Sequence, residues 1–176
     1  MRQSLIRVLI AIIGIAASVA LILALSWDRR AEANKPNPPL PTAQWLVGSP
    51  PLQTILTLEV ARNPEEQKIG LANREHLGLA DGMAFPRARP IPAAFWMRDM
   101  HFPLDLVFVG PAGRVLNVIH WAQPGSDDLQ RATGPTSLVI EVQAGRSQLL
   151  GLVPGALVAP IRSGSNSAII AQRNRE

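Results

Sequence analysis

The chain has 176 residues, no cysteine, a formal net charge of +4 and a sequence pI of about 10.9. Its length allows one ordinary domain with appendages, and the absence of cysteine excludes a disulfide scaffold and thiolate metal sites. Residues 50–160 hold nine Lys/Arg and ten Asp/Glu, so the basic excess lies outside the expected domain. A nucleic-acid-binding domain carries its positive charge on the folded part, and we therefore expect no nucleic-acid partner.

Residues 1–30 are predicted to be an N-terminal membrane anchor or signal segment. Val8 to Leu25 is an uncharged run of 18 residues, close to the roughly 20 that span a bilayer and longer than the roughly 7–15 of a cleavable signal. We therefore expect a transmembrane helix over residues 8–25, retained in the cytoplasmic membrane. The Lys/Arg counts on its two sides do not decide the orientation. A short basic N-terminus ahead of an apolar segment and a long domain is typical of an export signal. This predicts that the domain lies on the outer side of the cytoplasmic membrane. A secreted or periplasmic protein after signal cleavage is the alternative.

Residues 31–53 contain six prolines. Proline removes backbone donors and favours the extended polyproline II conformation, which predicts a stiff spacer between membrane and domain. Trp45 and Leu46 are interpreted as incidental apolar residues of this spacer. At the other end of the chain, residues 161–176 predict a loose polar tail.

Residues 54–160 are expected to form a β-rich domain, because apolar residues alternate with others in several short runs. The runs lie at residues 54–60, 95–109, 115–121, 138–142 and 156–160, with a short strand at 82–85. Residues 110–113 predict a hairpin turn between two of the runs. The proline-containing residues 86–92 and the polar residues 122–136 predict loops.

One short helix is expected to begin at Asn63. Asn63 can cap the helix, Pro64 suits its first position, and the Glu66 carboxylate can reach back to the cap. A single short helix is too little for parallel crossovers. The sequence therefore predicts a compact, mainly antiparallel β-sandwich or a partly open barrel.

The stretch of residues 95–109 supplies most of the candidate site. Read as a strand, it places Phe95 and Met97 on one face and Trp96 and Arg98 on the other. Asp105, like Glu141 in its own run, lies opposite the main apolar face. If the apolar faces point into the core, the polar residues share the opposite side of the sheet. The candidate functional surface comprises Arg74, Trp96, Arg98, Asp99, Asp105 and Glu141.

Two interpretations of this set remain open. If Asp105 and Glu141 converge, one pKa rises and the pair can act as the acid and base of a hydrolase-like enzyme. Alternatively, each carboxylate is paired with an arginine such as Arg74 or with loop backbone, and the cluster is a clasp between a loop and the sheet. Trp96, with Arg98 and Trp121, predicts either an aromatic platform for a sugar or polymer, or a core or edge tryptophan beside a cation.

Met83, Met97, Met100 and His101 include the soft ligand types that suit Cu(I) outside the cytoplasm. In a strand, however, Met97 and Met100 point to opposite faces, and methionine commonly fills gaps in cores. The three histidines show no metal-ligand spacing, and the sequence holds no phosphate-binding loop and no Gly-x-Ser-x-Gly. We therefore expect no metal and no cofactor.

Several segments, taken in order, resemble the family catalogued as domain of unknown function 192. They are residues 63–71, 82–85, 95–99, 103–105, 139–145, 150–151 and 154–155. The resemblance runs from about Thr54 to Pro160. It implies a compact, mostly β domain, often exported or membrane-anchored in prokaryotes, with no established activity, substrate or cofactor. Met100 departs from the small hydroxyl residue common at its position. The expected function is a binding or interaction module in the cell envelope, whose partner is an envelope polymer or protein, with the hydrolase-like enzyme as the alternative.

Overall fold

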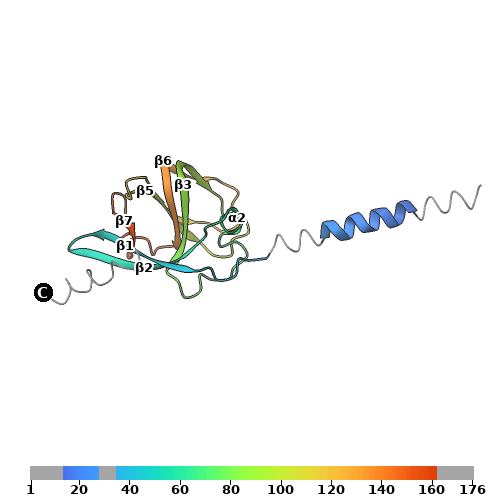
Figure 1. The fold of residues 1–176 in the computed structure, drawn as a ribbon, viewed down its shortest axis with the longest axis horizontal. Helices are drawn as coiled ribbons and strands as arrows, with labels where there is room; N and C mark the ends of the chain where they lie inside the picture. The colour runs from blue at the N-terminus through green and yellow to red at the C-terminus, as the bar shows by residue number, and fades with distance from the viewer. Residues whose placement is uncertain (1–13, 28–34, 162–176) are drawn as a thin grey trace, which may run out of the picture. The chain divides into compact units, whose positions relative to one another are not determined.

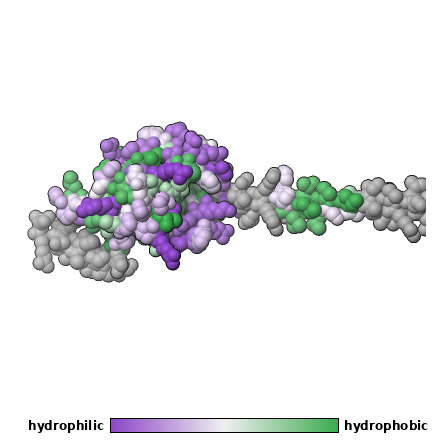
Figure 2. All heavy atoms as spheres, turned by 90° about the horizontal axis from the view of Figure 1, so that it is seen from above, coloured by the Kyte–Doolittle hydropathy of each residue, from purple (hydrophilic) through white to green (hydrophobic). Residues whose placement is uncertain are grey.

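The computed structural model describes residues 14–27 and 35–161 and divides the chain into two units between Lys35 and Pro36. Residues 14–27 are helical, and their large apolar side chains are exposed (Figures 1 and 2). Within the two described ranges, no helix combines the length and hydrophobicity that a bilayer crossing requires. The predicted anchor over residues 8–25 extends into residues 8–13, which lie outside the described ranges, as does the predicted tail after Ile161.

The second unit is a seven-stranded sheet with one short helix in its described part. Its elements are β1 (Thr42–Ser49), β2 (Leu52–Val60), α2 (Pro64–Ile69), β3 (Gly82–Phe95), β4 (Leu104–Val109), β5 (Val115–Ala122), β6 (Gln130–Gln143) and β7 (Val158–Pro160). The strand order is β5-β4-β6-β3-β2-β1-β7, and neighbouring strands are antiparallel except for β2 and β3. The prediction of a mainly β fold is confirmed.

The sheet curls until its two edge strands meet. Arg114, just before β5, and Leu157, just before β7, form an antiparallel bridge. Beside this bridge, Val158 N donates to Gly113 O over 2.7 Å. Because these contacts are confined to a short length of the edges, the sheet is a partly open barrel (Figure 1), the second of the two predicted architectures.

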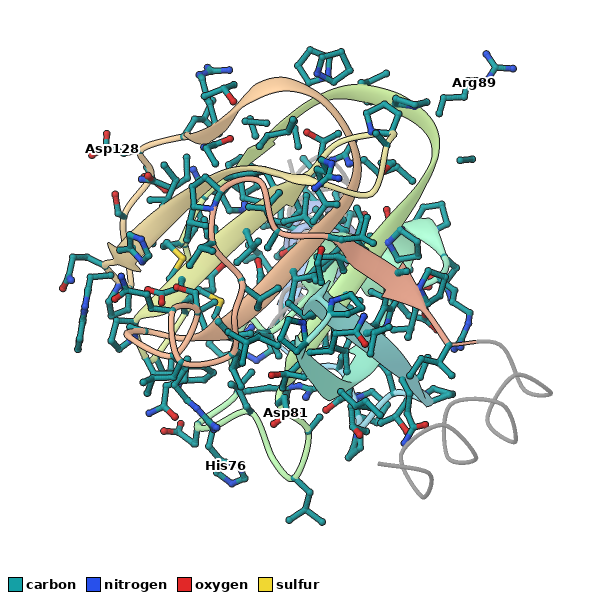
Figure 3. The ribbon with its side chains drawn as sticks, turned by 90° about the vertical axis from the view of Figure 1, so that its left-hand side faces the viewer. His76, Asp81, Arg89 and Asp128 are labelled. Atoms are coloured by element: carbon teal, nitrogen blue, oxygen red, sulfur yellow. The ribbon has the colours of Figure 1, made fainter. Side chains whose placement is uncertain are left out.

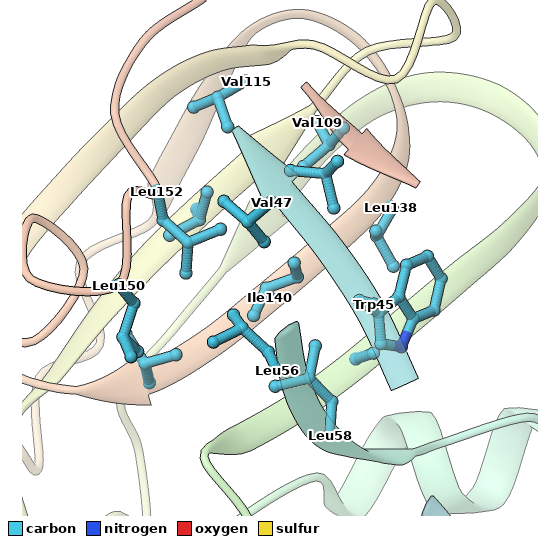
Figure 4. Packing of buried hydrophobic residues seen from close by; sticks show 14 residues of the cluster. Trp45, Val47, Leu56, Leu58, Val109, Val115, Leu138, Ile140, Leu150 and Leu152 are labelled. Carbon is cyan, nitrogen blue, oxygen red and sulfur yellow. The ribbon is translucent and has the colours of Figure 1, made fainter. Parts of the chain in front are cut away.

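Two apolar clusters lie on the two faces of this sheet. The barrel core comprises Trp45, Val47, Leu56, Leu58, Ala84, Val107, Val109, Val115, Leu138, Ile140, Val142, Leu150, Leu152 and Val158 (Figure 4). The loop-covered core comprises Leu40, Ala61, Leu71, Met83, Phe85, Ala93, Met97, Met100, Leu104, Leu106, Phe108, Ala122 and Val139. Alternate residues of β4 and β6 supply the two cores, as the period of two in a strand requires.

β1 contradicts the prediction that the spacer continues to residue 53. This strand pairs with β2 along its whole length and with β7 over three residues. Trp45 is only 8% exposed and belongs to the barrel core, so it is not an incidental residue. The prediction failed because the prolines flank the strand without interrupting its ladder, a position that a sheet tolerates. Asn37 is also buried, which places the beginning of the domain near Pro36.

The long strand β3 contradicts two further predictions. It runs through the expected loop at 86–92, and its ladder with β6 shifts register at this proline-containing part. It ends at Phe95, so residues 96–103 form a loop where a strand was expected. Strand parity therefore does not govern the directions of the side chains from Trp96 to Met100. The helix start was predicted correctly, since Asn63 and Glu66 form a capping box.

Candidate functional site

Four loops lie side by side and are joined by backbone hydrogen bonds. We call residues 71–77, 96–103, 121–129 and 144–147 together the loop surface, in which the third range includes the last two residues of β5. Its bonds run from Asn73 N to Asp99 O (2.7 Å), from Met97 N to Ser126 O (3.0 Å), from Gly125 N to Met97 O (2.8 Å) and from Ala144 N to Pro103 O (3.2 Å). These bonds connect segments far apart in the chain and hold the loops in one arrangement.

Three residues of the loop surface adopt the left-handed backbone conformation. They are Asn73, Asp99 and Trp121, with φ values of 60°, 59° and 54°, and no other non-glycine residue of the described ranges has a positive φ. This conformation is uncommon outside glycine, least so for Asn and Asp, and it tends to cluster at functional sites. Because all three of these left-handed residues lie on the loop surface, we take the loop surface as the candidate site.

Trp96 and Arg98 form an exposed aromatic and charged pair on this surface. The Arg98 guanidinium lies 4.6 Å from the centroid of the Trp96 ring, and its Nε donates to Asp127 Oδ1 over 2.6 Å. The Asp127 hydrogen bond and charge raise the pKa of Arg98. Trp96 remains 51% exposed. The stack and ion pair hold the indole in place, although an exposed ion pair contributes little to stability.

Trp121 is the second large aromatic residue of the loop surface and is 59% exposed. Its ring packs over Gly145, where a Cβ atom would come within 3.2 Å of the indole. Gly145 also has a positive φ of 80°. The positive φ favours glycine at this position, and a larger residue would also have to displace the indole by a few tenths of an ångström.

Asp105 is completely buried and serves as an acceptor for the loop backbone. Its carboxylate accepts hydrogen bonds from Trp121 N (2.9 Å), Gly145 N (3.0 Å), Ser147 N (3.2 Å) and Ser147 Oγ (2.7 Å). Burial acts to raise the pKa of Asp105, but the bonds from Trp121, Ser147 and Gly145 outweigh it and hold the pKa below the usual range. His120 Nδ1 lies 3.6 Å from the same carboxylate and 3.3 Å from Ser147 Oγ. Asp105 thus anchors two of the loops to β4.

Glu141 is buried in a different way. It is 5% exposed, and none of the described residues forms a hydrogen bond or ion pair with its side chain. Burial in these apolar surroundings raises the pKa of Glu141 to about 8. Burial without a hydrogen-bonded partner disfavours the charged form of a carboxyl, which is the physical cause of this raised pKa.

Arg74 forms a clasp with Glu59. Its Nη1 and Nη2 donate to the two Glu59 oxygens over 2.9 Å each, while Nε and Nη2 donate to the carbonyls of Asn37 and Pro38. Glu59 Oε2 also accepts from Leu40 N over 2.7 Å. This buried network ties the entering chain to β2 and to the loop after α2.

The predicted surface is thus only partly assembled. Trp96, Arg98 and Asp99 lie on the loop surface, whereas Arg74 pairs with Glu59 and contacts neither of the two carboxyls expected to converge. Asp105 and Glu141 belong to neighbouring strands, but the register pairs Asp105 with Val142 and Glu141 with Leu106. Val142 belongs to the barrel core and Leu106 to the loop-covered core, so the two carboxyls point to opposite faces of the sheet. They do not form an acid and base pair.

Other residues of the site were not predicted. Asp127, His120 and Ser147 come from separate loops and strands, and their partners lie at least 15 residues away in the chain. No local pattern in the sequence signals such contacts. Other polar loop residues, His76 and Asp128 among them, project outward from the domain (Figure 3). Within the described ranges, no three His, Asp or Glu side chains are placed to hold a metal.

The fold and site define a small, partly open β-barrel domain with a loop surface held together by backbone hydrogen bonds. Residues 48–159 match the model of the family described as domain of unknown function 192, uncharacterised ACR. The chain belongs to this family, as the resemblance predicted.

Two solved structures are similar to this chain. One is a protein of unknown function from Novosphingobium aromaticivorans, with 36% identity and a TM-score of 0.64, over 71% of this chain and 91% of that one. The other is described as a putative transcription regulator from Sinorhizobium meliloti, with 25% identity and a TM-score of 0.64, over 70% and 97% of the two chains. No curated protein matches the chain.

Proposed function

We propose that this protein is a membrane-anchored module that binds a neutral polysaccharide of the cell envelope through its loop surface. The observation that carries the proposal is the presence of two tryptophans that are more than half exposed on the loop surface: Trp96 on a loop held by hydrogen bonds and Trp121 at the end of β5. Soluble proteins normally bury most of so large a side chain, and exposed aromatic anchors are typical of binding sites.

The chemistry of the surface favours a sugar polymer. An indole offers a flat apolar face to the apolar face of a sugar ring, and Arg98 and Asp127 beside it can exchange hydrogen bonds with hydroxyl groups. The charges of Arg98 and Asp127 balance each other, which favours a neutral ligand over an anionic one. Because the loops are already ordered, binding costs little additional conformational entropy.

The anchor and the location are part of the same proposal. They rest on the uncharged run of residues 8–25 and on the exposed apolar side chains of the helical residues 14–27 (Figure 2). A reporter enzyme that is active only after export, fused to the C-terminus, is expected to be active. If instead a reporter that works only in the cytoplasm is active at the same position, the domain lies on the cytoplasmic side and the proposed orientation is wrong.

The binding test uses the full chain in detergent and sedimentation with insoluble polysaccharides, one neutral glucan and one anionic polymer. We expect retention by the neutral polymer and loss of about tenfold or more in affinity for Trp96→Ala and for Trp121→Ala, since an anchoring tryptophan is worth about 2 kcal/mol or more. Leu52→Ala, which truncates an exposed apolar residue of β2, is the matched control and should bind as the parent does. Equal retention of all variants would contradict the proposal.

The hydrolase-like alternative needed Asp105 and Glu141 to converge. Because the two carboxyls lie on opposite faces of the sheet, that alternative has no geometric support.

A further inference from the structure

The first half of β2 has an open edge in the described domain. On one side, β1 pairs with β2 along its whole length. On the other side, β3 begins at Gly82, opposite Leu58, and pairs only with residues 58–60. In Figure 1, β1 and β2 extend as a hairpin past the rest of the sheet. No described strand therefore covers residues 53–56 on the side away from β1.

Alternate residues of β2 direct their backbone groups toward this open side. Thr57 shows the direction, because its N donates to Asp81 Oδ2 and its O accepts from Asp81 N, each over 2.9 Å. Asp81 lies just before β3, on the side away from β1. Since the direction of the backbone groups alternates along a strand, Gln53 and Ile55 point theirs the same way. Nothing in the described ranges forms a hydrogen bond with these groups of Gln53 and Ile55.

The sequence leaves this edge unprotected. Natural sheets block pairing at open edges with proline or with charged side chains. The later part of β3, which runs past the end of β2, follows this rule and contains Pro86, Arg87, Arg89, Pro90 and Pro92. Residues 53–55 are exposed, and no charged residue or histidine occurs from Pro36 to Leu58. An exposed, uncharged strand edge of this kind favours pairing with a further strand.

We propose that this edge pairs with the same edge of a second copy of the chain, antiparallel and around a two-fold axis at Thr54. In this register Gln53 lies opposite the partner's Ile55, and Ile55 lies opposite the partner's Gln53. The backbone donors and acceptors that are open in one copy then meet those of the other. A two-fold arrangement uses the same surface on both copies, so it closes both open edges at once.

The ends of the open edge select this register. Pro51 is the preceding residue with the same backbone direction, and proline has no N–H to donate. At the other end, both backbone groups of Thr57 are already bonded to Asp81. Only a pairing centred on Thr54 matches Gln53 and Ile55 with each other. Because the hairpin is uncharged, two identical edges approach without repulsion between like charges.

This pairing goes beyond the proposed function and does not depend on it. Residues 53–55 lie outside the loop surface, and Trp96→Ala and Trp121→Ala leave them intact. Self-association and polysaccharide binding can therefore fail independently.

The experiment is disulfide trapping in the full chain in detergent, which contains no natural cysteine. In the proposed register, Thr54 faces its own copy at a position without hydrogen bonds, where Cα atoms lie about 4.5 Å apart, within the roughly 4.4–6.8 Å of disulfides. Gln53→Cys is the matched control, because residue 53 lies diagonally from its own copy at about 7–8 Å. Under mild oxidation, we expect Thr54→Cys to form a covalent dimer about tenfold faster than Gln53→Cys.

A second variant tests the backbone pairing itself. Ile55→Pro, introduced into the Thr54→Cys chain, removes an N–H that faces the open edge and leaves the ladder with β1 in place. An edge strand tolerates such a proline, and thermal unfolding should show a folded protein. Cross-linking should fall to the rate of Gln53→Cys. If this variant does not fold, the two cysteine variants decide the question by themselves.

The proposal is overturned if Thr54→Cys stays monomeric or cross-links no faster than Gln53→Cys. An edge occupied by a different protein, or by a segment of this chain outside the described ranges, gives this monomeric result. Equal cross-linking in the folded Ile55→Pro variant overturns it as well.

Discussion

Replacement of Arg74 by methionine tests the clasp that joins the entering chain to the sheet. The substitution removes both hydrogen bonds to Glu59 and those to the Asn37 and Pro38 carbonyls, and it leaves a buried carboxylate without its cation. Breaking a buried pair by removing one partner costs about 3–5 kcal/mol. For a domain of this size, the melting temperature should fall by about 10–20 °C.

The assay is chemical denaturation of the full chain in detergent, followed by Trp fluorescence, with the free energy of unfolding as the readout. The double variant Arg74→Met/Glu59→Met should recover part of the loss, since an apolar pair of similar volume often replaces a buried ion pair without cost. Recovery should be incomplete because Leu40 N loses its acceptor, at a cost of about 1–3 kcal/mol. The exposed pair of Arg98 and Asp127 is the control, and Arg98→Met should leave the free energy of unfolding nearly unchanged, because solvent screens an exposed ion pair. A loss below about 1 kcal/mol for Arg74→Met, within the range of an exposed pair, would refute this reasoning.

Three further predictions concern single groups. The pKa of Glu141 rises from 4.5 to about 8 on folding, so its contribution to stability is complete below pH 4.5 and is lost as the pH rises toward 8. The protein should therefore be less stable at pH 8 than at pH 5 by about 3 kcal/mol from this group, and urea titrations should show this slope disappearing in Glu141→Gln. The pKa of Asp105 is lowered on folding, so its stabilisation is present above pH 3.8 and is lost as the pH falls. Asp105→Asn should destabilise the protein at pH 7 by about 2–4 kcal/mol and flatten its acid unfolding curve, whereas an unchanged curve would argue against the four-donor arrangement. Asn63→Ala removes the cap of α2 and should lower the free energy of unfolding by about 1 kcal/mol in the same urea titration.

Local patterns predicted the elements whose geometry is set by neighbouring residues. The cap at Asn63 depends on Pro64 and Glu66 within one turn, and the structure contains the expected capping box. The alternation in residues 54–60 predicted β2, whose Leu56 and Leu58 face the barrel core. In each case the interacting groups lie a few residues apart, so the sequence itself contains the whole signal.

The failures share a different cause. Trp45 was placed in a spacer because its flanks are rich in proline, yet β1 is held by two partner strands, one of them more than a hundred residues later in the chain. Residues 96–103 were predicted as part of a strand because Phe95 and Met97 alternate with Trp96 and Arg98, but no strand pairs with them in the described domain. Hydrogen-bonding partners decide whether an extended run becomes a strand, and these partners are not visible in local periodicity.

Local sequence patterns were enough to indicate a mostly β domain of the 192 family, the helix cap, the alternating apolar faces of β2 and β4, and the residue types of the candidate site. Which of those residues meet depends on the folded arrangement of the strands and loops. It separated Asp105 from Glu141, paired Arg74 with Glu59, and gathered Met83, Met97 and Met100 into one cluster. The physical reason is that a strand's register and a loop's path depend on distant partners, and a shift of one residue sends a side chain to the opposite face of the sheet.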